Sequence, residues 1–247
     1  KLDMFLDKPS DAPIKSLAHL LKNIPPARLF EESLKLLQSG YGVKTYRLLR
    51  QYGLFEPLFP LLTPYFTEYE DSMTEKMILR ALTSTDERVA DKLPINPAFL
   101  FAAFFWYPLR ERVEVLKNEG GLNNYDAYAL ASNDVLEQLC KSLAVPRRHT
   151  AVIREIWLLQ LQFLKRTPKS VQRAIEQAKF RAGFDLLVIR AEIEGGEAVE
   201  LAAWWHEYQF SNESQRQDLV KALPSQPKKR KYHRRKRHHS AKKVSHE

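Results

Sequence analysis

The sequence predicts an almost wholly α-helical protein. Only 8 of the 247 residues are glycine. The chain is rich in Leu, Ala, Glu, Lys, Arg and Gln, which are good helix formers, and alternating β-branched runs are few. Apolar residues recur instead at helical spacing. A chain of this length can bury one large core or two small ones.

Caps and prolines set the boundaries of the first predicted helices. Ser10 and Asp11 are candidate N-caps of a helix with Pro13 in its first turn. Gly40 and Gly53 follow the ends of the next two helices, because glycine readily adopts the backbone conformation that ends a helix. The predicted ranges are 10–22, 26–38 and 42–52.

A turn region and longer helices follow. Pro57, Pro60 and Pro64 are too closely spaced for a continuous helix, so residues 54–66 are predicted as packed turns. The longest apolar run, Ala98–Leu109, is about half of what a membrane span requires, and we interpret it as a buried helix. Further helices are predicted at 72–83, 86–91, 97–107, 109–118, 124–142, 146–166, 168–192 with a break near 178, 196–210 and 213–221.

The net charge of +9 belongs to one segment. Ten Lys or Arg and one acid lie from Lys228 onward, so 29 residues of each sign remain from the chain's 39 basic and 30 acidic residues. From Pro224 onward there is no Leu, Ile or Phe, so this segment cannot bury enough surface to offset the entropy of ordering it. The sequence therefore predicts a balanced globular part and a disordered basic tail.

Signatures of common active sites are missing. There is no glycine-rich phosphate loop, no His-Glu-x-x-His and no Cys-x-x-Cys. The single cysteine, Cys140, cannot form an internal disulfide and indicates a reducing compartment, for which the cytoplasm is the simplest choice. Cys140 could act as a nucleophile with His149 or His206, but its place in the apolar stripe of a helix favours a packing role.

Aromatic residues offer a second candidate for binding. Trp106, Tyr107, Trp157, Trp204 and Trp205 could stack on nucleobases. Each lies within an apolar helix pattern, which favours a core position. Adjacent residues on a helix point about 100° apart, so Trp204 and Trp205 cannot both enter one narrow seam, and one of them is a candidate for exposure.

Cations recur on the helix predicted at 146–166. Arg147 and Arg154 lie one heptad apart on one side, with Arg148 beside them. Four more cations follow at its far end: Lys165, Arg166, Lys169 and Arg173. A nucleic-acid path is one interpretation, and a solvated helix face is the other. The second is favoured because acids such as Glu155 are interleaved.

The basic tail is the strongest signal that the residues give unaided. Its cations suit a flexible polyanion binder that gains affinity by releasing counterions from phosphates. The first eight of them are Lys228, Lys229, Arg230, Lys231, Arg234, Arg235, Lys236 and Arg237. The stretch PKKRK at residues 227–231 also fits a nuclear localisation signal. Nucleic-acid binding and nuclear import are therefore equally supported by the residues alone.

The stretch Ile24–Gly40, IPPARLFEESLKLLQSG, gathers four charges on one helix. Glu31 and Lys35 are spaced for an ion pair, and Arg28 can pair with Glu31 or with Glu32. Both acids lie near the helix start, where the helix dipole favours negative charge. The pattern alone favours a solvated helix face over a functional element.

Several long segments together carry a family resemblance. They are IPPARLFEESLKLLQSGYG, TYRLLRQYGLFEPLFP, NPAFLFAAFFWYPL, YDAYALASNDVLEQLCKSLAVPRR, IREIWLLQLQ and KFRAGFDLLVIRAEIE. In this order they are similar to segments of the bacterial poly(A) polymerases, relatives of the class II CCA-adding nucleotidyltransferases. The resemblance covers nearly all of residues 15–210. It implies neck helices at 1–62, a helical body at 63–223 and a basic RNA-binding tail at 224–247.

The resemblance also implies a catalytic head that these residues do not supply. The family's head carries a Gly-Ser dipeptide and an Asp-x-Asp pair, whose carboxylates hold Mg²⁺ for the attack of an RNA 3′ hydroxyl on ATP. The chain contains neither motif, and the neck's Glu-Asp-x-x-Arg element is expected just before Lys1. We therefore expect the carboxy-terminal part of such an enzyme, as a fragment or a truncated product. Without the carboxylates, the two-metal mechanism cannot operate in it.

The resemblance assigns roles to the charged positions. It implies that Arg28 and Glu31 or Glu32 brace the neck helices beneath the nucleotide pocket. The expected RNA-binding residues are Arg147, Arg148, Arg154 and the tail cations. The implied function is to hold single-stranded RNA for an enzyme that adds AMP to RNA 3′ ends in mRNA processing and decay, with RNA-decay proteins as further candidate partners and no membrane. The alternative is a non-enzymatic helical interaction module with a basic nucleic-acid-binding or nuclear-import tail.

Overall fold

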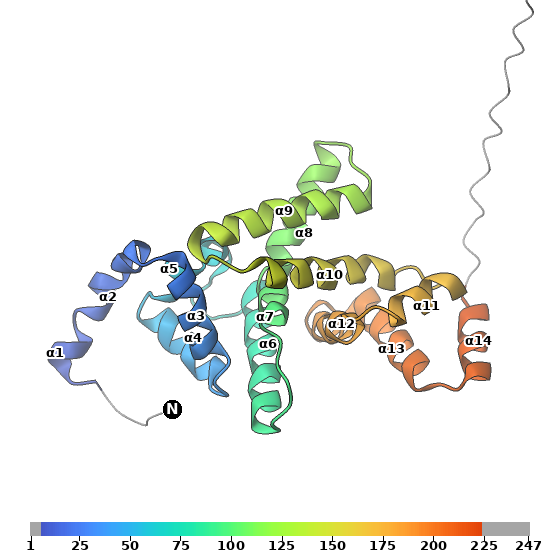
Figure 1. The fold of residues 1–247 in the computed structure, drawn as a ribbon, viewed down its shortest axis with the longest axis horizontal. Helices are drawn as coiled ribbons and strands as arrows, with labels where there is room; N and C mark the ends of the chain where they lie inside the picture. Colours follow the sequence, from blue (N-terminus) through green and yellow to red (C-terminus); the bar gives the residue numbers. More distant parts are fainter. Residues whose placement is uncertain (1–5, 224–247) are drawn as a thin grey trace, which may run out of the picture.

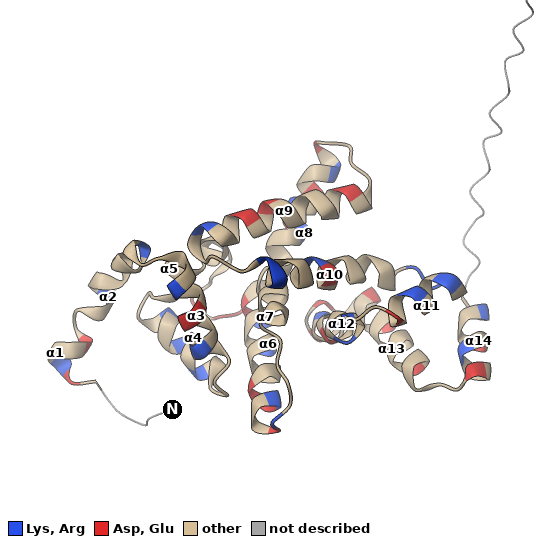
Figure 2. Ribbon diagram, viewed as in Figure 1, with Lys and Arg blue, Asp and Glu red and all other residues tan. Residues whose placement is uncertain are grey.

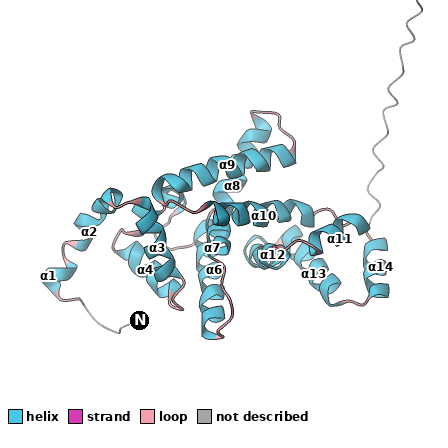
Figure 3. Ribbon diagram, viewed as in Figure 1, coloured by secondary structure: helices cyan, strands magenta, loops and turns pink. Residues whose placement is uncertain are grey.

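A computed structural model describes residues 6–223, in which every regular element is a helix and no strand occurs (Figure 3). The α-helices are α1 (Lys8–Asp11), α2 (Ile14–Leu17), α3 (Pro26–Leu37), α4 (Gly42–Gln51), α5 (Phe55–Leu58), α6 (Met73–Ala90), α7 (Pro97–Phe104), α8 (Trp106–Asn118), α9 (Asn124–Ser142), α10 (Arg147–Phe163), α11 (Pro168–Ile175), α12 (Phe180–Glu194), α13 (Gly196–Phe210) and α14 (Glu213–Lys221). Two 3-10 helices are η1 (Ala18–Asn23) and η2 (Pro60–Tyr65). Helices α1 and α2 lie at one end of an elongated molecule and α14 at the other (Figure 1). The predicted all-α fold is confirmed.

The helix predicted at 10–22 is wrong, because this segment consists of α1, α2 and η1. Pro13 has no amide to continue the hydrogen bonding of α1, and it becomes the N-cap of α2. Ser10 and Asp11 lie inside α1 and cap nothing. Ala18 is the only buried residue of the three elements, so no packing supports a longer helix.

Helices α3 and α4 begin and end close to their predicted positions, and a distant side chain caps the second. The positive φ of Gly40, 81°, permits the turn between them. The Asp86 carboxylate, from α6, accepts hydrogen bonds from the amides of Gly42 at 2.7 Å and Val43 at 3.1 Å. The first amides of a helix lack partners within the helix and carry partial positive charge. Asp86 therefore fixes the start of α4 against α6.

Two boundaries in the centre of the chain differ from the prediction. The two helices expected between residues 72 and 91 form the single helix α6. The Thr85 hydroxyl in its middle donates to the Ala81 carbonyl at 2.8 Å, so this polar residue is satisfied inside the helix. The break expected at Pro108 lies at Phe105, between α7 and α8. Pro108 falls in the first turn of α8, where backbone N–H groups have no acceptor within the helix. The absence of an N–H group at Pro108 therefore costs no helical hydrogen bond.

The remaining elements agree well with the prediction. Helices α9, α13 and α14 match the predicted ranges, and the break near residue 178 separates α11 from α12. Helix α10 ends at Phe163, three residues earlier than predicted. The prolines of residues 54–66 leave only α5 and η2, which confirms a region of packed turns.

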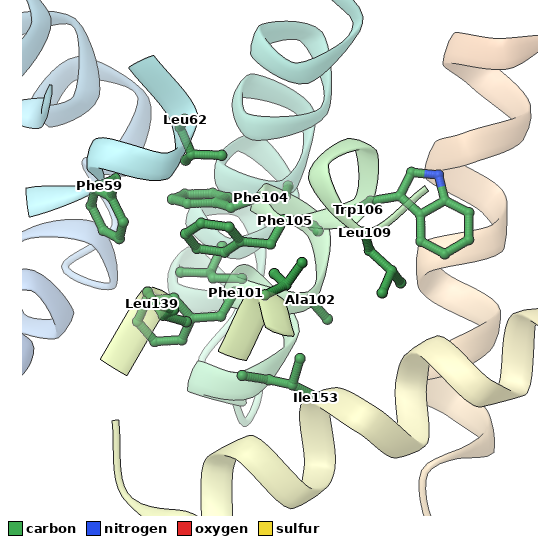
Figure 4. Close-up of a cluster of buried hydrophobic side chains, with 14 of the residues drawn as sticks. Phe59, Leu62, Phe101, Ala102, Phe104, Phe105, Trp106, Leu109, Leu139 and Ile153 are labelled. Atoms are coloured by element: carbon green, nitrogen blue, oxygen red, sulfur yellow. The ribbon is translucent and has the colours of Figure 1, made fainter. Parts of the chain in front are cut away.

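Helix α7 lies at the centre of the main hydrophobic core (Figure 4). Six of its eight residues are buried, on all sides of the helix. The ring of Phe59, from the turn region, lies 6.3 Å from Phe101 and 5.9 Å from Phe104. On the opposite side, the indole of Trp157 in α10 donates to the Ala102 carbonyl at 2.9 Å. The predicted burial of the run Ala98–Leu109 is confirmed, but the run is divided between α7 and the start of α8 and is not a single helix. Among the helices of residues 6–223, none is long and apolar enough to span a membrane.

A second cluster of buried residues joins the carboxy-terminal helices to α10. Helix α12 approaches α10 closely at Gly183, where a Cβ would lie 2.7 Å from Cδ1 of Leu159. The Gln160 side chain donates to the Gly183 carbonyl at 2.8 Å. Further along, the Trp205 indole in α13 donates to the Phe163 carbonyl at 3.0 Å. The end of α10 is thereby held by three neighbouring helices, because α11 also contributes Val171 and Ala174 to the cluster.

A buried carboxylate, Glu75, ties the start of α6 to α4. It accepts hydrogen bonds from the Arg50 guanidinium at 2.5 Å, from the Thr67 amide and hydroxyl at 2.9 and 2.8 Å, and from the Ser72 hydroxyl at 2.9 Å. Burial alone raises the pKa of Glu75, but these hydrogen bonds outweigh it and hold the pKa below its ordinary value. Glu75 is therefore charged and satisfied inside the protein.

Replacing Glu75 with glutamine is expected to lower the free energy of unfolding by about 2–4 kcal/mol at neutral pH, because Arg50 loses its buried counterion. The pKa of Glu75 is lower in the folded than in the unfolded chain. Its charge therefore stabilises fully above the unfolded value near 4.5, and this contribution disappears as the pH falls through the folded pKa. Urea unfolding of both proteins across this pH range measures the difference.

The matched control is Glu70→Gln, whose ion pair with the exposed Arg47 spans 3.3 Å. It should cost less than about 1 kcal/mol. A difference between wild type and Glu75→Gln that stays constant in acid would contradict the assigned pKa shift.

Candidate nucleic-acid interface

The charged group of α3 lies on the outer face of that helix (Figure 2). Arg28, Glu31, Glu32 and Lys35 are all exposed, while Leu29 and its apolar neighbours turn inward. Lys35 pairs with Glu32 at 2.8 Å, so the pairing expected with Glu31 is wrong. This hydrogen bond lowers the pKa of Glu32 and raises the pKa of Lys35. Among the described residues, no carboxylate lies within ion-pair distance of Arg28, so the expected pairing of Arg28 with either acid is also not formed.

The start of α3 meets the start of α10. The Ala144 amide, just before α10, donates to the Pro26 carbonyl at 3.2 Å. The rings of Phe30 and His149 lie 5.7 Å apart, and burial together with the charge of Arg148 lowers the pKa of His149. The exposed side chains of Arg147 and Arg148 therefore stand at the junction between the first helices and the rest of the fold.

A basic strip runs along α10 and α11 (Figure 2). Residues 147–179 contain eight Lys or Arg and only two acids, Glu155 and Glu176. None of the eight cations forms an ion pair with a described carboxylate. The two acids leave a net charge of +6 on residues 147–179, and the nucleic-acid path and the solvated helix face both stay predictions. Of the predicted residues, Arg147 and Arg148 are exposed, while Arg154 is half-buried.

The tryptophans belong to the core. Trp106, Trp157 and Trp205 are fully buried, and Trp204 is only 9% exposed. The suggestion that one of the adjacent pair is exposed is wrong, because Arg166 lies over the Trp204 ring at 5.5 Å and Tyr208 stacks on it at 5.2 Å. The Trp204 ring is therefore covered on two sides. The tryptophans offer no platform for a nucleobase.

An exposed aromatic that sequence reasoning missed is Tyr125, near the start of α9. Its side chain is 61% exposed and lines a cavity between α9, α10 and α11. The buried stripe of α9 begins with Ala127 and Tyr128, so the core does not use Tyr125. A position off the apolar stripe of its own helix was the signal that could have identified this residue.

Candidate catalytic groups do not converge. The Cys140 thiol packs beside the core, with the Val145 carbonyl at 3.9 Å, which agrees with its predicted packing role. His149 packs on Phe30 and His206 lies 4.8 Å from the ring of Phe210. Within residues 6–223, no three His, Cys, Asp or Glu side chains form a group that fits a metal ion.

The predicted tail cations, Lys228, Lys229, Arg230, Lys231, Arg234, Arg235, Lys236 and Arg237, lie outside the described residues. The last described residue, Leu223, packs against the same buried cluster as Val171 and Ala174 of α11. The RNA binding expected of the tail cations stays a prediction.

Two family models match the chain. Residues 3–66 match the model described as the probable RNA and SrmB-binding site of polymerase A, which here spans α1 to η2. Residues 120–239 match the model described as the polymerase A arginine-rich C-terminus, which includes the whole basic strip. Both models describe the same polymerase.

Curated relatives agree with these matches. Poly(A) polymerase I of Haemophilus influenzae is 72% identical over 240 residues, which are 96% of this chain and 53% of the relative. Poly(A) polymerase I of Salmonella typhimurium is 50% identical over 92% of this chain and 49% of the relative, and that of Escherichia coli O6:H1 is 49% identical over 96% and 51%. The chain spans about half the length of these relatives. On both family matches and on these identities, the chain belongs to the bacterial poly(A) polymerase family.

Proposed function

We propose that this chain holds single-stranded RNA for a polynucleotide adenylyltransferase that adds AMP from ATP to RNA 3′ ends. The observation that carries the proposal is the basic strip, where eight cations face only two acids. Residues 1–227 are otherwise balanced in charge, so this local excess is a property of α10 and α11. Cations without carboxylate partners can exchange solvent for phosphates and release the counterions of the strand.

The tail adds to the same surface. Ten more cations lie from Lys228 onward, in the segment that follows α14 in sequence. An RNA strand bound along α10 and α11 could be contacted by the basic strip and by the tail cations. Membership of a bacterial polymerase family favours this role over an interaction module with a nuclear-import tail.

Other parts of the proposal concern the whole enzyme. ATP and Mg²⁺ would bind to residues that this chain does not supply, since it has neither Gly-Ser nor Asp-x-Asp. Arg28, Glu31 and Glu32 would brace the neck beneath the nucleotide pocket, and their exposed face leaves them accessible for it. We retain the division into neck 1–62, body 63–223 and tail 224–247, a cytoplasmic location, a role in mRNA polyadenylation and decay, and RNA-decay proteins as additional partners.

Replacing Arg147 and Arg148 together with alanine tests the body surface. Each phosphate contact on a single strand contributes about 0.7 to the slope of log affinity against log salt, so this variant should flatten the slope by about 1.4. The control Lys76→Ala with Lys92→Ala removes two exposed cations from residues 67–119, which neither family model matches, and should change neither slope nor affinity. Fluorescence anisotropy with labelled oligo(A) at several salt concentrations measures the affinity and its salt dependence. An unchanged slope in the arginine variant would show that α10 does not contact the strand.

Deleting residues 228–247 tests the tail. It removes ten cations, so the slope should flatten by as much as about 7 and the affinity should fall. The melting temperature should stay within about 1 °C, because the deleted segment has no Leu, Ile or Phe to contribute to a core. Anisotropy and thermal unfolding of the same preparation measure both quantities. A loss of several degrees would contradict the prediction that the tail adds no packing.

The 247-residue chain alone is expected to incorporate no AMP into RNA from ATP and Mg²⁺, because it lacks the carboxylate motif of two-metal catalysis. Incorporation of radiolabelled AMP into an oligo(A) primer is the measurement. A full-length relative such as the Haemophilus influenzae enzyme is the positive control. Sustained primer extension by the isolated chain would refute the inference that the catalytic residues lie outside it.

A further inference from the structure

A pocket of about 510 Å³ opens where the start of α9, the end of α10 and the start of α11 meet. This volume lies within the range of roughly 300–1,000 Å³ that is typical of small-ligand sites. The residues of its lining used below are Tyr125, Leu158, Leu161, Leu164, Lys165 and Arg173. Neither family model's description and no relative's name assigns a ligand to this pocket.

The lining combines an aromatic ring with an apolar floor. Tyr125 is 61% exposed and Leu164, at the C-cap of α10, is 56% exposed. Leu158 and Leu161, on the preceding turns of α10, complete the apolar surface. An exposed ring beside exposed leucines suits a flat ligand, because a planar face can stack on the ring and cover the leucines.

The rim of the pocket is positively charged. Lys165 and Arg173 line it, and Lys169 is exposed on the same short stretch of chain. None of the three pairs with a described carboxylate.

The acids nearest in sequence are engaged elsewhere. Asp126 accepts a hydrogen bond from the Asn123 side chain at 2.5 Å, and Glu176 accepts one from the Gln172 side chain at 2.6 Å. The pocket therefore offers stacking and cations together, without a carboxylate directed into its lining.

This combination selects among ligand classes. A free phosphate would use the cations but not the ring and leucines, and an apolar peptide would use the leucines but not the cations. A nucleotide within a single strand uses both, because its base stacks while its flanking phosphates meet the rim. A duplex does not, because its bases are stacked on one another and closed to a side chain.

We propose that this pocket binds one nucleobase of single-stranded RNA, with Tyr125 stacked on the base and Lys165 and Arg173 on the flanking phosphates. The proposal rests on the RNA-binding function proposed above and adds a fixed point to it. A strand held only by charge can slide along the basic strip, whereas a stacked base sets its position. Among bases, purines gain most from stacking because their ring face is larger.

The test uses the 247-residue chain and a labelled 15-nucleotide oligo(A) strand. Tyr125→Ala is expected to raise the Kd about 5- to 150-fold, since base stacking on an aromatic residue is worth about 1–3 kcal/mol by alanine substitution. Tyr125→Phe keeps the ring and should stay within about twofold of wild type. Tyr69→Ala is the matched control, because Tyr69 is 80% exposed and lies outside the pocket. On an abasic strand of the same length, Tyr125→Ala and wild type should bind alike.

A second variant, Leu164→Glu, places a carboxylate in the pocket at an exposed position and should weaken oligo(A) binding at least fivefold. Melting temperatures within about 2 °C of wild type establish that both variants fold. If wild type binds oligo(A) and Tyr125→Ala binds it equally well, the pocket assignment is wrong while RNA binding stands. If Tyr125→Ala loses the same factor on the abasic strand, Tyr125 does not read a base. If wild type binds no RNA, the proposed function and the pocket assignment are both wrong.

Discussion

Helix α7 has no polar face, and this constraint organises the rest of the molecule. A helix that is apolar on all sides has to be enclosed by its neighbours. Phe59 closes it from the turn region, while α6 and α10 pack along its length. Helix α10 has 17 residues and α7 has 8, so α10 is about 25 Å long against about 12 Å. The ends of α10 therefore extend beyond the helix that they cover, and its exposed cations, Arg147 and Arg148, lie at its start.

Neutral overall charge in residues 1–227 conceals a separation of charge in space. The basic strip of residues 147–179 carries eight cations and two acids, whereas residues 111–137 of α8 and α9 carry six acids and two cations. Acids of this second segment are visible along α9 in Figure 2. A polyanion is attracted to the basic strip and repelled by the acids of α8 and of the later part of α9, Asp134 and Glu137, so it approaches in a preferred orientation. The composition of the chain gives no sign of this arrangement.

Local patterns predicted much of the fold and part of the candidate site. The ranges of α9, α13 and α14 followed from apolar spacing and caps, and Arg147 and Arg148 were identified because they adjoin a predicted helix start. What failed depended on contacts between distant residues. The capping of α4 by Asp86 and the covering of Trp204 by Arg166 join elements far apart in sequence. Tyr125 was missed because its position off the apolar stripe of α9 indicates exposure but gives no sign that α10 and α11 form a pocket beside it.

The bond between the Ala144 amide and the Pro26 carbonyl has a mechanical consequence. It attaches the start of α3 to the start of α10, because α10 begins three residues after Ala144. Helix α10 then runs without a break to Phe163. A tilt of α10 by about 5° about its start would move the far end of this helix, which is about 25 Å long, by about 2 Å. A small rotation at the start of α3 would therefore be accompanied by a movement at the far end of α10, where α11, α12 and α13 pack against it.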